Sequence, residues 1–112
     1  MDRFDEKLLG DYTVTVFNCT DFTELEIKVL IRKFRRELGI RLGIPKRILE
    51  IQYDYNRLAD KYGGTPLPSS ASLEERLIVE QWGGAYEAAL HIAFKGIRPP
   101  PEDAYFAVHE PD

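Results

Sequence analysis

Apolar residues follow two different periods along the chain, and each period predicts a type of element. Tyr12 to Phe17 is rich in β-branched and aromatic residues on both faces, which predicts a strand inside a sheet. Thr23 and Glu26 have the spacing of a capping box, so we expect a helix to begin near Phe22. Two glycines and a proline between positions 39 and 45 mark where this helix can end. Its core-facing stripe consists of Ile27, Leu30, Ile31, Phe34 and Leu38.

Two later segments alternate apolar and polar residues with a period of two, which predicts half-buried strands. The first segment runs from Arg47 to Asn56, and the second runs from Tyr86 to Lys95. The second contains alanines, which favour helices, so a helix stays its alternative. The apolar face would consist of Leu49, Ile51, Tyr53 and Tyr55 in the first segment, and of Tyr86, Ala88, Leu90, Ile92 and Phe94 in the second.

Turn residues and a second capping box separate the two alternating segments. Arg57 to Ser70 contains two glycines and two prolines, which predicts the longest loop of the chain. Ser72 and Glu75 have capping-box spacing, which predicts a short helix through about Trp82. Gly83–Gly84 follows directly and is expected to end that helix.

The predicted order of elements is strand, helix, strand, helix, strand. Three prolines at 99–101 predict a stiff turn, after which Tyr105 to His109 can add a short edge strand. Helical connections between parallel strands pack the helices on the sheet. We therefore predict one α/β domain over residues 1–112, a βαβαβ(β) arrangement with a mixed sheet and two helices packed on it. Residues 1–10 would be an N-terminal extension, and residues 96–112 a Pro-rich turn with an acidic tail.

The first predicted helix has a second apolar stripe on nearly the opposite side from its core-facing stripe. A helix lying on a sheet needs only one such stripe, so the second stays exposed unless another part of the chain covers it. We interpret it as an interface for another protein or for a second copy of the chain, because recognition surfaces combine apolar residues with arginines. Coverage by the Pro-rich loop or the C-terminal tail is the alternative. The predicted contact residues are Phe22, Leu25, Val29, Arg32 and Arg36.

Charge is unevenly distributed along the chain. The whole sequence carries −4, whereas Lys28 to Arg47 holds eight basic residues and one acid, Glu37, and so carries +7. The remainder must then carry −11. Such a basic segment makes nucleic-acid binding through phosphate contacts a second hypothesis, although the sequence pI of about 5.2 is low and no recognition motif is present. Its residues would be Lys28, Arg32, Arg35, Arg36 and Arg47.

Cys19 is the single cysteine and lies between the first predicted strand and the first predicted helix. A helix N-terminus lowers the pKa of a thiol. In this placement the chain resembles thioredoxin-like proteins, and the resemblance implies a thiol protein with Cys19 as its reactive group. The chain lacks the second cysteine of a Cys-x-x-Cys pair, and no proline precedes the third predicted strand. A small buried residue is the simpler interpretation.

No cofactor or metal motif accompanies these residues. Neither His91 nor His109 has a metal-ligand spacing, and the chain has no phosphate loop or dinucleotide fingerprint. We therefore favour a non-catalytic interaction module without cofactor or metal, and an enzyme working at Cys19 or His91 is the third hypothesis. A charged N-terminal segment, one cysteine and no long apolar run lead us to expect a cytoplasmic protein without membrane contact.

Overall fold

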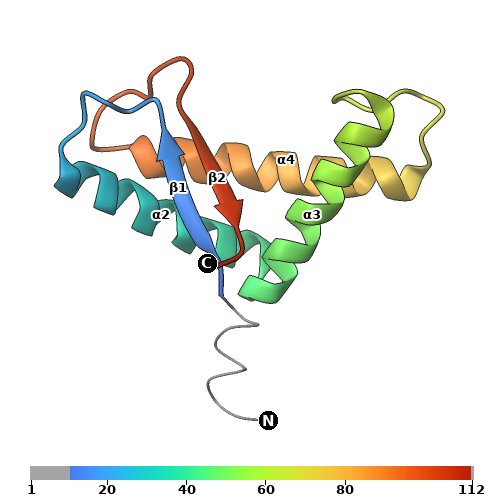
Figure 1. The fold of residues 1–112 in the computed structure, drawn as a ribbon, viewed down its shortest axis with the longest axis horizontal. Coiled ribbons are helices and arrows are strands. Elements are labelled where there is room, and N and C mark those ends of the chain that lie inside the picture. The colour runs from blue at the N-terminus through green and yellow to red at the C-terminus, as the bar shows by residue number, and fades with distance from the viewer. Residues whose placement is uncertain (1–10, 112) are drawn as a thin grey trace, which may run out of the picture.

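The computed structural model describes residues 11–111, which form three helices and two strands (Figure 1). The strands are the first and last elements, and the helices lie between them in sequence. Within these residues, none of the helices has both the length and the apolar character needed to cross a membrane. The elements are β1 (Thr13–Phe17), α2 (Glu24–Leu42), α3 (Pro45–Tyr62), α4 (Leu73–Phe94) and β2 (Tyr105–His109).

The two strands form one antiparallel sheet. The register runs from Thr13 opposite His109 to Phe17 opposite Tyr105. Because side chains alternate between the two faces of a strand, one face of this sheet packs on the helices and the other faces outward. Figure 1 shows the pair of strands crossing in front of α2 and α4. The residues of the inner face that are buried against the helices are Val14, Phe106 and Val108.

Aromatic rings join the sheet to α2 and α4. Phe34 of α2 is fully buried, and its ring stacks on Phe106 of β2 at a centroid distance of 4.0 Å. Tyr86 of α4 meets the same Phe34 ring edge-on at 5.6 Å. Phe94, at the end of α4, meets Phe106 edge-on at 6.0 Å. Such geometries are favourable for aromatic pairs, so these four rings bind β2, α2 and α4 into one core.

The third helix, α3, stands beside this core. It packs mainly on α4, with smaller contacts to α2 and β2, and Figure 1 shows it projecting past the sheet. The C-terminal end of α3 is tied to the start of α4 through Glu75. The carboxylate of Glu75 accepts hydrogen bonds from the Tyr62 hydroxyl at 2.8 Å and from Lys61 Nζ at 3.1 Å.

Both capping boxes predicted from the sequence are present. Thr23 Oγ1 accepts a bond from the Glu26 amide at 3.1 Å, and the Glu26 carboxylate accepts one from the Thr23 amide at 2.9 Å. Ser72 and Glu75 make the same reciprocal pair. The predicted starts of these two helices are therefore confirmed. Strands near residues 12–17 and 105–109 are also present as predicted, but among the described residues β1 is an edge of a two-stranded sheet and does not lie inside a larger one.

The predicted βαβαβ(β) domain with a mixed sheet and two helices is wrong. The segment Arg47 to Asn56 was expected to be a strand and instead lies within α3. The residues that α3 buries are spaced as on one side of a helix, and Tyr53, which the period of two placed on the apolar face, is 68% exposed. The apolar residues of this segment fit both the period of a strand and the period of a helix. The buried residues with helical spacing continue beyond the end of the segment. The buried residues of α3 are Ile48, Ile51 and Leu58.

The prediction of a strand over Tyr86 to Lys95 is also wrong, and the helical alternative is the one found. The helix that starts at the Ser72 box passes through Gly83–Gly84 and ends at Phe94. Tertiary packing overrides the helix-breaking tendency of the glycine pair. The predicted loop from Arg57 begins only after Tyr62. The helix α4 packs most extensively on α2. Small buried residues spaced four apart on α4 allow this close approach, and they are Ala85, Ala89 and Ala93.

Candidate functional site

One side of α2 carries apolar residues and arginines away from the core. Leu25 is 72% exposed, Arg32 and Arg36 are exposed, and Val29 is partly buried. Ile40, which the sequence analysis did not include, lies one turn beyond Arg36 on the same side and is 65% exposed. At a rise of 1.5 Å per residue, Leu25 and Ile40 are about 22 Å apart along the helix. We call these five residues the outer face of α2.

Phe22, the first of the predicted contact residues, is partly covered by its own chain. Its ring meets Phe94 edge-on at 5.7 Å, and the Arg98 guanidinium lies 4.1 Å from the ring centroid. Phe22 directly precedes the N-cap Thr23, a position from which apolar side chains commonly pack back on the helix. The C-terminal end of α4 and the loop after it therefore cover Phe22 but leave Leu25 uncovered.

Two residues of the nucleic-acid hypothesis are engaged within the protein. Arg35 donates to the carbonyl of Tyr12 and to Asp11 Oδ1, and its guanidinium lies 4.2 Å from the centroid of the Tyr12 ring. Lys28 forms an exposed ion pair with Glu24 at 3.5 Å. The structure thus ties Arg35 to the start of β1 instead of presenting it to a phosphate.

The other three basic residues of that hypothesis are exposed. Among the described ion pairs of residues 11–111, none involves Arg32, Arg36 or Arg47. Arg32 and Arg36 lie on the same side of α2, whereas Arg47 is in the first turn of α3. Their charges are available to a partner of opposite sign, and two of the three belong to the outer face of α2.

Cys19 is a buried thiol, 7% exposed, in the loop between β1 and α2. Burial raises its pKa, because it disfavours the thiolate, and the negative charge of Asp103 acts in the same direction. The first residue of α2 is Glu24, five positions after Cys19, so the thiol does not sit at the N-terminus of the helix. These features are those of a packing residue and not of a nucleophile.

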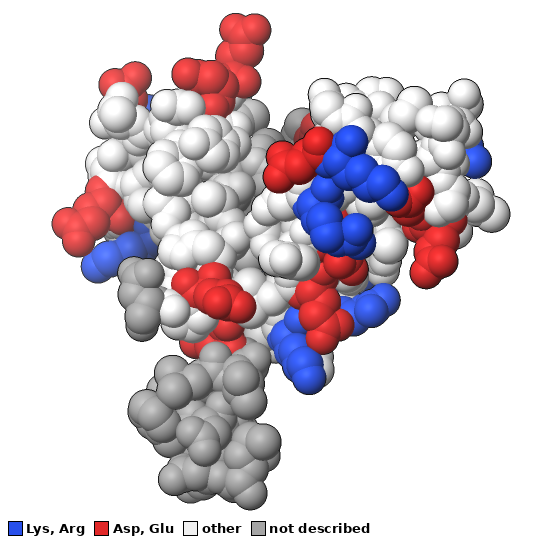
Figure 2. All heavy atoms as spheres, turned by 45° about the vertical axis from the view of Figure 1, so that its right-hand side comes forward, with Lys and Arg blue, Asp and Glu red and all other residues white. Residues whose placement is uncertain are grey.

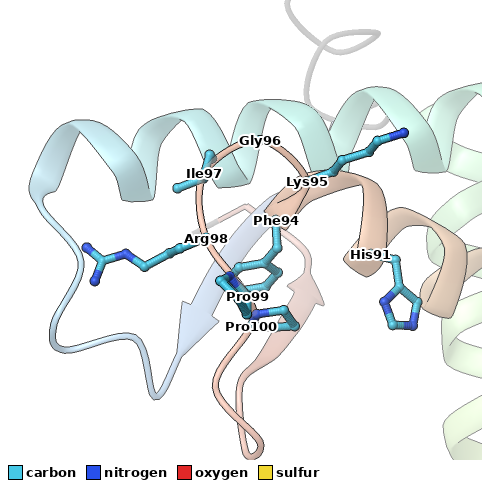
Figure 3. Close-up of a pocket in the computed structure, with 8 residues that line it drawn as sticks. All are labelled: His91, Phe94, Lys95, Gly96, Ile97, Arg98, Pro99 and Pro100. Atoms are coloured by element: carbon cyan, nitrogen blue, oxygen red, sulfur yellow. The ribbon is translucent and has the colours of Figure 1, made fainter.

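His91 lies on α4 and borders a shallow pocket of about 390 Å³ at the end of that helix (Figure 3). Its Nε2 is 3.6 Å from the carboxylate of Glu87 on the solvent side. Figure 3 shows the side chains of Lys95 and Arg98 extending away from each other, with Phe94 and the proline rings between them. The residues that line the pocket include no carboxylate, hydroxyl or thiol, and its one amine belongs to Lys95.

No metal centre is formed by the part of the chain from residue 11 to 111, in which no three His, Cys, Asp or Glu side chains come together. Of the predicted site residues, those on the outer face of α2 are the ones that lie together on one surface.

A second surface feature was missed by the sequence analysis. A groove of about 350 Å³ lies between α3, α4 and β2, and we call it the aromatic groove. The sequence analysis placed the α3 residues and Tyr86 in strands and Trp82 and Gly83 at the end of a short helix, so it did not bring them together. The signal available in the sequence was the group of aromatic residues spread over those segments. The groove is lined by Gln52, Tyr55 and Asn56, by Trp82, Gly83 and Tyr86, and by residues 106–108.

Comparisons with known proteins add no relationship to this geometry. A scan of protein-family models matches none to the chain, and searches of curated proteins and of solved structures return no significant match.

Proposed function

We propose that the chain is a non-catalytic protein-interaction module that binds through the outer face of α2. The observation that carries this proposal is the exposure of Leu25 and Ile40 at the two ends of one helix face. Between them lie Arg32 and Arg36, for which the described residues provide no ion pair. A surface that combines exposed apolar residues with arginines has the composition that protein interfaces favour.

The chemistry of this face specifies its partner. Burying Leu25 and Ile40 together contributes about 3–6 kcal/mol, which covers at most the lower end of the cost of association, about 4–15 kcal/mol. The two arginines must therefore find carboxylates as well. An amphipathic helix with apolar residues at both ends and acidic residues in the middle meets both requirements when it lies along α2.

A second copy of the chain satisfies this description only through a different helix. Antiparallel pairing of α2 with its own copy would bring the arginines of both chains together, which like-charge repulsion disfavours. The exposed side of α4 supplies part of this pattern, with apolar residues at its start and acidic residues further along. Its members are Leu73, Leu77, Glu80 and Glu87.

The test compares the wild type with a double variant that carries both Leu25→Glu and Ile40→Glu. We expect the wild type to self-associate in light scattering coupled to size exclusion, or to retain a protein that carries an acidic amphipathic helix in affinity capture. Two buried carboxylates would be repelled by the partner and would abolish either association. Tyr53→Glu changes an equally exposed apolar residue on α3 and serves as the matched control. A strictly monomeric wild type that retains no partner, or a double variant that associates like the control, contradicts the proposal.

A further inference from the structure

We propose that the aromatic groove is a second binding site, independent of α2, that takes an extended and uncharged peptide segment as an added strand along β2. The groove lies on the side of β2 opposite to β1, between that strand and α3, with α4 as its floor. Each of the three walls supplies one feature of peptide recognition.

The first wall is the open edge of β2. The Phe106 amide donates to the Tyr86 hydroxyl at 2.9 Å, so it points away from β1 and towards α4. Inward and outward backbone groups alternate in an antiparallel pair, so Val108 presents its N–H and C=O on the same edge as Phe106. No side chain of residues 11–111 bonds to Val108, which lines the groove. A peptide strand can pair with this edge beyond the point where Tyr86 caps it.

The second wall presents two carboxamides. Gln52 and Asn56 are four residues apart on α3 and both line the groove, so they point to the same side of the helix. Neither side chain forms a hydrogen bond with another described residue. A carboxamide carries one acceptor and one donor group, as a peptide bond does, so each can bond to the backbone of a strand lying between α3 and β2.

The floor is aromatic and open at one point. The Trp82 ring lies between those of Tyr55 and Tyr86, with centroids 6.3 and 6.2 Å away. Next to Trp82, Gly83 also lines the groove, and a Cβ placed on it would meet no heavy atom within 4 Å beyond its two chain neighbours and the backbone of its own helix. This free volume over an aromatic floor accepts an aliphatic side chain or a proline ring.

The absence of charge selects the occupant. None of the residues that line the groove is charged. In Figure 2 the sheet side of the molecule is largely white, and the charged side chains gather in a column over α3 beside it. Because an unpaired charge loses its hydration in such a groove, the site favours segments without Lys, Arg, Asp or Glu. The outer face of α2 would select the opposite, an acidic helix.

The experiment uses a phage-displayed library of random heptapeptides, followed by titration of blocked synthetic peptides of the selected sequence. Trp82 is the single tryptophan of the chain, so its fluorescence reports directly on the floor of the groove. We expect uncharged peptides rich in β-branched residues to be enriched and to change this fluorescence on binding.

Gly83→Leu is the decisive variant, because it fills the groove while replacing a poor helix former by a good one. It should weaken peptide binding at least tenfold, and the double variant Gln52→Ala with Asn56→Ala should do the same. Gly84→Leu is the matched control, since Gly84 is exposed, also has free space at its Cβ and does not line the groove. The control should bind like the wild type, and circular dichroism confirms that all variants keep the helical content.

Three results would overturn the inference. They are a selection that enriches no peptide, peptides that bind Gly83→Leu as tightly as the wild type, and acidic peptides whose binding is lost in Arg36→Glu. The last result would support the outer face of α2 and reject the groove. Failure at α2 with retained binding in the groove would instead reject only the proposed function, so the two proposals fail separately.

Discussion

At the scale of single residues, Glu75 shows how one carboxylate joins two helices. It completes the capping box of α4 by accepting from the Ser72 amide at 3.0 Å, and it also accepts from Tyr62 and Lys61 at the end of α3. These bonds stabilise the ionised form and lower the pKa of Glu75 to about 2, with the Ser72 amide as the largest cause.

This shift makes stability depend on pH in a defined direction. The pKa of Glu75 is lower in the native state than its ordinary value of 4.5, so its contribution to stability is present above pH 4.5 and is lost as the pH falls towards 2. We expect Glu75→Gln to lower the free energy of unfolding at pH 7 but to change it little at pH 2, as measured by urea denaturation at both pH values. Glu74→Gln, which removes a neighbouring carboxylate without these bonds, is the control. An equal loss at both pH values would contradict this account.

At the scale of elements, the packing of α4 on α2 depends on its small residues. Ala89 has no exposed surface, and Ala88 beside it is only half-buried. We expect Ala89→Leu to reduce the free energy of unfolding by about 1–3 kcal/mol, because the larger side chain forces the helices apart. Ala88→Leu should change it by about 0.5 kcal/mol or less. Thermal and urea unfolding of both variants measure the difference, and equal effects would show that Ala89 is not at the close contact.

The same elements show what the sequence could and could not predict. Local signals were sufficient for the two strands and for the starts of α2 and α4, where a capping box acts within four residues. They were insufficient for α3, where Leu49 and Tyr53 are apolar without being buried and so imitate the period of a strand. In α4 the alanines differ too little in hydrophobicity from their neighbours to define a buried face in the sequence. The buried stripe can be recognised only once α4 is packed on α2.

The candidate sites divide in the same way. Exposure of Leu25, Arg32 and Arg36 followed from their position on one helix, which a wheel can show. The partial cover of Phe22 comes from Arg98 and Phe94, more than 70 positions away in the chain, and no local pattern contains that contact. The aromatic groove needs three elements in place and was therefore beyond sequence reasoning.

At the scale of the whole molecule, β2 closes the core that α2 and α4 begin. Phe106 contacts the rings of Phe34 and Phe94 and is 4% exposed. We expect Phe106→Ala to lower the free energy of unfolding by about 3–5 kcal/mol, the usual cost of removing a buried phenyl ring. Tyr105→Ala, on the outward face of the same strand, removes a half-exposed ring and should cost clearly less. Urea denaturation of the two variants distinguishes them, and equal losses would mean that β2 does not close the core.

The pairing of β1 with β2 also determines when this protein can finish folding during its synthesis. A ribosome must add on the order of 90 residues after β1 before its partner strand exists, which is a long loop to close. Until then, the nascent chain can bring α2 and α4 together but leaves the Phe34 and Phe94 rings open to other chains. A translation product that stops before Tyr105 would therefore be a substrate for chaperones and proteases.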